Sequence, residues 1–215
     1  MCIMLILEKF NIMKASFFSD LKSLDLKDEH QIYDFCRKKV LHGTPYIFKN
    51  QEDHYYSFRK KIAQKYEISF HEIYITGSAK LGFSPHKNKD FDLDSDIDVA
   101  IISEKLFEKV MLQITEFQMA LRSSRKSLQK HELDTYHSFL EYTAMGWIRP
   151  DKLPIKFQMK ELKNDWFDFF HSLSYGKSEV GNYKVAAGIF KSYSHYERYI
   201  VSGFTEVKHQ IGLTK

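Results

Sequence analysis

Apolar side chains recur along this chain at two different spacings, one typical of helices and one typical of strands. Intervals of three and four residues predict helices with one buried face, and Ser103 precedes one of these helices at the N-cap position. The sequence His-Gly-Thr-Pro at residues 42–45 ends the first of them. The predicted helices cover residues 21–40, 52–66, 104–121 and 130–145.

Other segments follow strand patterns. Residues 72–76 and 97–102 are short runs rich in β-branched side chains, which predict buried strands. Residues 153–160 alternate between apolar and polar side chains, which predicts a half-buried strand. The remaining segment, residues 164–210, is rich in aromatic side chains and is predicted to be helical.

Strands interleaved with helices favour an α+β fold, in which a small mixed sheet is flanked by helices. We expect three parts along the chain. Residues 1–70 form a helical N-terminal lead-in, residues 71–161 form the core that carries the strands, and residues 162–215 form a C-terminal helical part packed on that core.

Composition narrows the class of protein. With 215 residues, of which 43% are hydrophobic, the chain can bury a sizeable core. A net charge of +4 tilts slightly toward polyanionic partners such as nucleotides or nucleic acid. Two cysteines suggest neither a disulfide framework nor a zinc cluster. The apolar start, Met1 to Leu7, is too short to span a membrane, so we expect a cytoplasmic protein without a membrane partner.

The candidate chemistry lies around the first two predicted strands. Gly77 and Ser78 follow the first strand, in a turn where backbone N–H groups and a hydroxyl can approach phosphates closely. Asp96 and Asp98 are two residues apart at the start of the second strand, so their carboxylates share one face and can bind Mg²⁺. Lys80, in the segment between the strands, can add positive charge toward the same phosphates.

This pattern, over residues 73–103, resembles the nucleotidyltransferase superfamily, which includes DNA polymerase β, poly(A) polymerases, CCA-adding enzymes and the cGAS/DncV-like second-messenger synthases. The resemblance implies a polymerase β-like core that transfers NMP from an NTP to a hydroxyl and releases pyrophosphate. It implies Mg²⁺ or Mn²⁺ as cofactor, with Asp96 and Asp98 as catalytic metal ligands. Gly77, Ser78 and Lys80 would then hold the triphosphate.

Two further residues enter through the same resemblance. Poly(A)-polymerase-like and cGAS-like members place a lysine and a hydroxyl from a helical domain on the nucleotide, and Lys191 and Ser192 are similar in kind. The alternative for Lys191 is an ordinary surface position on a helix. Lys184 has the same two interpretations, because we expect it near the start of that helix.

Active members of this superfamily usually carry a third carboxylate on a later core strand. The predicted strand at residues 153–160 has no acid on its polar face, where Gln158 would be a weak neutral ligand. Asp134, Glu141 and Asp151 are the alternatives if the strand is aligned differently.

The sequence leaves open the acceptor, which is an RNA, a protein side chain or another nucleotide. Small stand-alone members of the superfamily often belong to bacterial defence or toxin–antitoxin systems, so the resemblance extends to such a role. Two other classes stay open. One is a nucleotide- or RNA-binding module that keeps the fold without turnover, and the other is a partner protein whose acids merely begin a strand.

Overall fold

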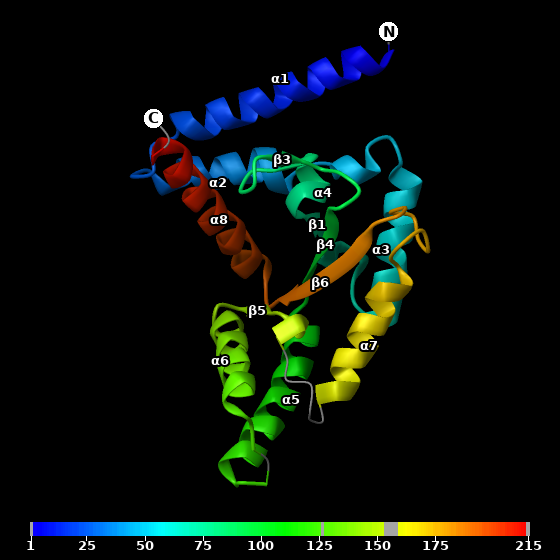
Figure 1. Ribbon diagram of the computed structural model, residues 1–215, viewed down its shortest axis with the longest axis vertical. Coiled ribbons are helices and arrows are strands. Elements are labelled where there is room, and N and C mark those ends of the chain that lie inside the picture. Colours follow the sequence, from blue (N-terminus) through cyan, green and yellow to red (C-terminus); the bar gives the residue numbers. More distant parts are fainter. Residues whose placement is uncertain (1, 126, 153–158, 214–215) are drawn as a thin grey trace.

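A four-stranded sheet lies at the centre of the computed structural model, which describes residues 2–125, 127–152 and 159–213 (Figure 1). Its order is β1 (Ile73–Thr76), β4 (Asp96–Ile102), β6 (Lys184–Phe190) and β5 (Trp147–Ile148). β4 is antiparallel to β1 and parallel to β6, and β5 is antiparallel to β6. A short second sheet pairs β2 (Phe83–Ser84) with β3 (Lys89–Asp90). The α+β class with a small mixed sheet is confirmed.

Helices make up most of the remaining described chain, and the predicted helix at residues 52–66 is confirmed to the residue. Those at 104–121 and 130–145 are confirmed within one residue at their ends, and Ser103 caps the first of these two as expected. The helices are α1 (Cys2–Ser23), α2 (Glu29–Cys36), α3 (Glu52–Tyr66), α4 (Gly77–Leu81), α5 (Glu104–Arg122), α6 (Lys130–Ala144), α7 (Met159–Ser172) and α8 (Tyr193–Leu213), and the short turns are η1 (Arg37–Leu41), η2 (Tyr46–Phe48), η3 (Phe70–Glu72) and η4 (Pro150–Lys152).

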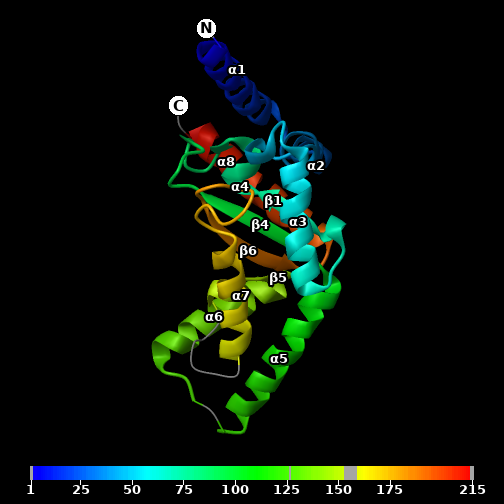
Figure 2. The ribbon, with the colours of Figure 1, turned by 90° about the vertical axis from the view of Figure 1, so that its right-hand side faces the viewer.

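The two faces of the sheet are covered differently. One face packs its apolar side chains, including Ile75, Val99 and Val185, against α3, α5, α6 and α7. Figure 2 shows α3 in front of the strands on this side and α7 below them. On the other face, Ile102 and Phe190 pack with α8, which joins the sheet to α1 and α2. Asp96 and Asp98 also lie on this second face, at the start of β4, whereas Ile102 lies at its end. The candidate chemistry is therefore on the second face.

One prediction at the C-terminal side is wrong, and another falls mostly outside the described residues. Of the strand predicted at residues 153–160, which includes Gln158, residues 153–158 lie outside the described residues, and Met159 and Lys160 begin α7 instead. The helix predicted over residues 164–210 is interrupted, because residues 184–190 form β6.

The first predicted helix, residues 21–40, is also divided. Its range covers the end of α1, a break at residues 24–28, all of α2 and most of the π-helical turn η1. Asp28 explains the restart, because its side chain accepts a hydrogen bond from the backbone N–H of His30 at the N-cap of α2. Among the described residues, no helix is both long and apolar enough to cross a membrane.

Candidate functional site

Asp96 and Asp98 lie on the same face of β4, as the period of a strand requires. Asp98 is exposed, and the side chain of Asp96 keeps 42% of its surface accessible. Residues 100 and 102 continue this face, and Ala100 and Ile102 are buried in the cluster that includes Phe190 and α8. Helix α8 therefore covers the far half of the face and leaves the carboxylate end open.

Gly77 packs directly against Asp98. It follows Thr76, which is paired with Asp98 across β1 and β4, and its φ of +65° is a conformation that favours glycine. A Cβ atom added at Gly77 would lie 2.8 Å from Oδ2 of Asp98, so a side chain there requires the carboxylate to move. Ser78 follows in the first turn of α4 and is half-buried. The predicted Gly-Ser turn and the predicted carboxylates thus meet at one end of the sheet.

We expect Gly77→Ala to be harmful in two ways. The left-handed backbone costs an alanine about 1 kcal/mol of folding stability, and the new methyl group must displace the carboxylate of Asp98. Chemical denaturation measures the first effect, and Mg²⁺-dependent nucleotide binding measures the second. Gly176→Ala is the matched control, since Gly176 has a φ of +78° but nothing within 4 Å of an added Cβ. Equal nucleotide binding by the two variants would contradict the proximity argument.

The electrostatics of the pair are unusual for exposed acids. Desolvation by the surrounding protein, and then the charge of Asp96, raise the pKa of Asp98 to about 6. The positive charges of Lys184, Lys87 and Arg149 oppose this increase in pKa. Asp98 is open to solvent on one side, yet enough protein surrounds it elsewhere to disfavour its charged form. A carboxylate whose pKa is raised by burial and by a neighbouring like charge is a candidate functional residue.

Because the pKa of Asp98 is raised, its contribution to stability should fall as the pH rises. The unfolded group titrates near 3.8 and the folded group near 6, so the folded state takes up the proton more readily between these values. We therefore expect the parent protein to lose stability relative to Asp98→Asn as the pH increases through this window. Melting temperatures of both proteins on either side of the window test this, and a constant difference would contradict it.

Three predicted site residues point elsewhere. The ammonium of Lys80 is buried and donates hydrogen bonds to the backbone carbonyls of His42, at 2.7 Å, and Gly43. Lys191 bonds Glu108 at 2.9 Å, and Ser192 lies 2.8 Å from Nδ1 of His195.

These interactions suit structural roles. Burial lowers the pKa of Lys80 to about 8, and the two carbonyls satisfy its ammonium. The structure therefore brings Gly77, Ser78, Asp96 and Asp98 together, and it directs the side chains of Lys80, Lys191 and Ser192 to other partners.

The strand beside the carboxylates is β6, and it places no acid next to them. Its register sets Lys184 beside Asp96 and Ala186 beside Asp98, and Nζ of Lys184 lies 3.0 Å from Oδ2 of Asp96. Of the acids considered from the sequence, Asp134 and Glu141 are exposed on α6, and Asp151 binds Arg149 through both carboxylate oxygens.

No described set of three His, Cys, Asp or Glu side chains is grouped to hold a metal ion. Asp96 and Asp98 still fit a hard cation that brings its own ligands, because Mg²⁺ is commonly held by one or two carboxylates together with substrate phosphates and water. The residues therefore fit a metal that is shared with a nucleotide.

Several residues that the sequence did not mark surround the pair. Arg149 influences the pKa of Asp98, and its guanidinium lies 5.2 Å from the ring of Trp147. Burial, and then the charge of Asp98, raise the pKa of Tyr199, an α8 residue 4.5 Å from Trp147 by ring centroids. The signal for β5 was weak, because this strand is only two residues long.

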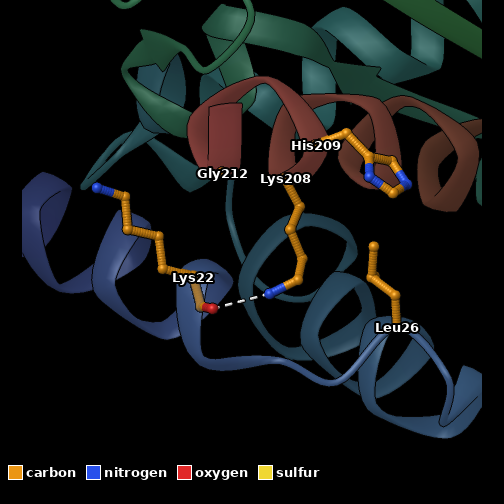
Figure 3. A pocket seen from close by; sticks show the side chains of 5 residues that line it. All are labelled: Lys22, Leu26, Lys208, His209 and Gly212. Atoms are coloured by element: carbon orange, nitrogen blue, oxygen red, sulfur yellow. Dashed lines mark hydrogen bonds between the residues drawn. The ribbon is translucent and has the colours of Figure 1, made fainter. Parts of the chain in front are cut away.

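A separate hollow lies at the far end of α8 from this site (Figure 3). It is lined by Lys22, Leu26, Lys208, His209 and Gly212. Nζ of Lys208 donates hydrogen bonds to the carbonyls of Leu21, at 3.2 Å, and Lys22, at 2.8 Å, at the end of α1. This lysine therefore caps a helix, since a cation there satisfies terminal carbonyls.

Comparison of the chain with protein-family models, with curated proteins and with solved structures finds no significant match.

Proposed function

We propose that this protein is a metal-dependent nucleotidyltransferase with a polymerase β-like core, which transfers NMP from an NTP to a hydroxyl acceptor. The observation that carries the proposal is the contact of Gly77 with Asp98. A strand, a Gly-Ser turn and a second strand with two carboxylates follow one another in the chain, and the two strands are neighbours in the sheet. This is the arrangement that the sequence resemblance implies.

The reaction uses the open end of the sheet face. The acceptor oxygen forms a bond to the α-phosphorus while the bond from the α-phosphorus to the oxygen bridging to the β-phosphate breaks. Pyrophosphate leaves with that electron pair, and the hydroxyl proton passes to water. Asp96 and Asp98 would hold Mg²⁺ or Mn²⁺, which would neutralise phosphate charge and lower the pKa of the attacking hydroxyl.

The chain's own residues would position the triphosphate. Gly77 lies close to Asp98 and carries no side chain, and Ser78 follows it in the first turn of α4, so their backbone N–H groups and the Ser78 hydroxyl would be the groups that bind phosphate. Lys87 and Arg149 place positive charge near Asp98. Two parts of the proposal rest on the resemblance alone. One is the class of acceptor, which is an RNA, a protein or a nucleotide, and the other is a role in bacterial defence or a toxin–antitoxin system.

A second candidate is a nucleotide- or RNA-binding module of the same fold that lacks turnover. The ion pair between Lys184 and Asp96 favours it, since a lysine faces the carboxylates from β6 where a third acid would complete a metal site. The enzyme and a nucleotide-binding module of this fold both require a nucleotide site at Gly77 and Asp98. They differ in whether NMP is transferred.

Thermal unfolding with each of the four NTPs and Mg²⁺ tests the shared site. A ligand at a hundred times its dissociation constant stabilises the folded state by about 2.7 kcal/mol. We expect at least one NTP to raise the melting temperature of the parent, and not that of Gly77→Ala. If no NTP raises it, the enzyme and a nucleotide-binding module both fail, and an RNA-binding module or a partner protein without a nucleotide site becomes the better account.

A further inference from the structure

Lys184 is the first residue of β6 and is fixed beside Asp96 by the parallel pairing of β4 and β6. Paired residues of neighbouring strands point to the same face, so Lys184 and Asp96 face the same open surface as Asp98. Nζ of Lys184 donates a hydrogen bond to Oδ2 of Asp96 at 3.0 Å. The lysine is thus part of the carboxylate site and not a side chain in a distant loop.

This ion pair has little value for stability. The side chains of Lys184 and Asp96 keep 53% and 42% of their surfaces accessible, and exposed ion pairs usually add little to the stability of a protein. Its effect on charge is larger, because Asp96 and Asp98 repel each other and Lys184 partly relieves that repulsion. A role in managing the charge of the site explains the position of Lys184 better than a role in folding.

We propose that Lys184 is a built-in counter-cation for Asp96, so that the site takes up a divalent metal weakly alone and well only together with a nucleoside triphosphate. This inference deepens the proposed function, since it concerns how the same site acquires its metal.

The ligands available to a metal ion explain why it would be taken up together with a triphosphate. Among the described residues, a metal ion that binds Asp96 without a nucleotide finds two carboxylates, those of Asp96 and Asp98, and it meets the repulsion of the Lys184 ammonium. A triphosphate changes both conditions, because its oxygens supply further metal ligands and its negative charge attracts the ammonium. The lysine is half exposed, so it can turn from Asp96 toward phosphate without disturbing β6.

The test measures Mn²⁺ binding by electron paramagnetic resonance in the absence of nucleotide. We expect Lys184→Ala to bind Mn²⁺ about tenfold more tightly than the parent, because one positive charge beside a metal ligand is removed. Lys184→Arg keeps the charge and should match the parent. Lys105→Ala is the matched control, since Lys105 is an exposed lysine in the first turn of α5, beyond the opposite end of β4.

A Mn²⁺ affinity of Lys184→Ala within about threefold of the parent's would overturn the proposal. Melting curves establish that each variant is folded, and Lys184→Gln replaces the alanine variant if that one is not. The titration is then repeated in the presence of a non-hydrolysable ATP analogue. The Mn²⁺ affinity of the parent should now be within about threefold of that of Lys184→Ala, and a roughly tenfold difference that persists would also overturn the proposal.

Failure of this inference and failure of the proposed function give different results. The titration without nucleotide depends only on the carboxylates and Lys184, whereas the proposed function fails when no NTP binds or no NMP is transferred. If the parent binds Mn²⁺ alone as tightly as Lys184→Ala does, and still transfers NMP, then Lys184 is not a counter-cation but the proposed enzymatic function stands.

Discussion

Replacing Asp98 by Asn should lower the rate of NMP transfer at least about a thousandfold, which corresponds to roughly 4 kcal/mol of transition-state stabilisation. Asn keeps the size of the side chain and removes the negative charge that the metal requires. Asp98 is the acid that Gly77 contacts and whose pKa is raised to about 6, so it lies at the centre of the proposed site. The rate of transfer from an NTP labelled at the α-phosphorus, into RNA or lysate protein, measures the effect.

The stability of the Asp98→Asn variant distinguishes a loss of transfer activity from a loss of the folded state. Asp98→Asn removes a repulsion with Asp96, so at neutral pH the variant should unfold at the same temperature as the parent or higher. Asp94→Asn is the matched control, because Asp94 is exposed in the preceding turn and its backbone N–H bonds Asp92. If Asp94→Asn loses as much transfer activity as Asp98→Asn, then transfer depends on the overall negative charge of this segment and not on the site at Asp98.

Replacing Tyr196 by Ala should destabilise the protein by about 4 kcal/mol, the second large effect that we expect. Tyr196 is 2% exposed, and its ring centroid lies 5.1 Å from that of Phe190 and 5.9 Å from that of Tyr74. It therefore joins α8 to both β6 and β1 on the face that carries the carboxylates. Removing the ring leaves a cavity at the junction, and the midpoint of denaturant unfolding measures its cost.

The control lies on the same helix. Tyr193 is 43% exposed at the start of α8, so Tyr193→Ala should cost no more than about 1 kcal/mol. Tyr196→Phe retains the ring and should also lose about 1 kcal/mol at most. If Tyr196→Ala proves no more costly than Tyr193→Ala, then α8 is not anchored to the sheet through Tyr196.

The sequence predicted the half of the site that depends on local pattern. β1 and β4 are β-branched runs whose type does not depend on distant parts of the chain, and the two-residue period of a strand places Asp96 and Asp98 on one face. The apposition of Gly77 and Asp98 follows once these two strands pair antiparallel, with Thr76 opposite Asp98.

The other half depends on contacts between distant segments. β6 reads Lys-Val-Ala-Ala-Gly-Ile-Phe, and Val185 and Ile189 are four residues apart, as on a helix. The strand forms because it pairs with β4 and buries these two side chains in the main core. Gly188 has a reason of the same kind, since a Cβ there would lie 2.5 Å from Nε1 of Trp147 on β5.

Lys80 and Lys184 illustrate the same limit. Lys80 is two residues after Ser78, where a role on phosphate is natural, but α4 directs it to carbonyls near residue 43 that sequence spacing does not bring near. Lys184 is 88 residues from Asp96, and only the register of β6 makes them partners. A one-dimensional pattern marks which residues carry chemistry more readily than it marks which of them meet.

The most direct test of the account compares two labels of the same NTP in the presence of Mg²⁺ and total RNA or cell lysate. The account predicts that label at the α-phosphorus joins an acceptor while label at the γ-phosphorus is released in pyrophosphate, and that neither occurs with Asp98→Asn. Transfer of the γ-label, or NTP binding without movement of either label, would contradict nucleotidyl transfer, and the second outcome would leave a nucleotide-binding module.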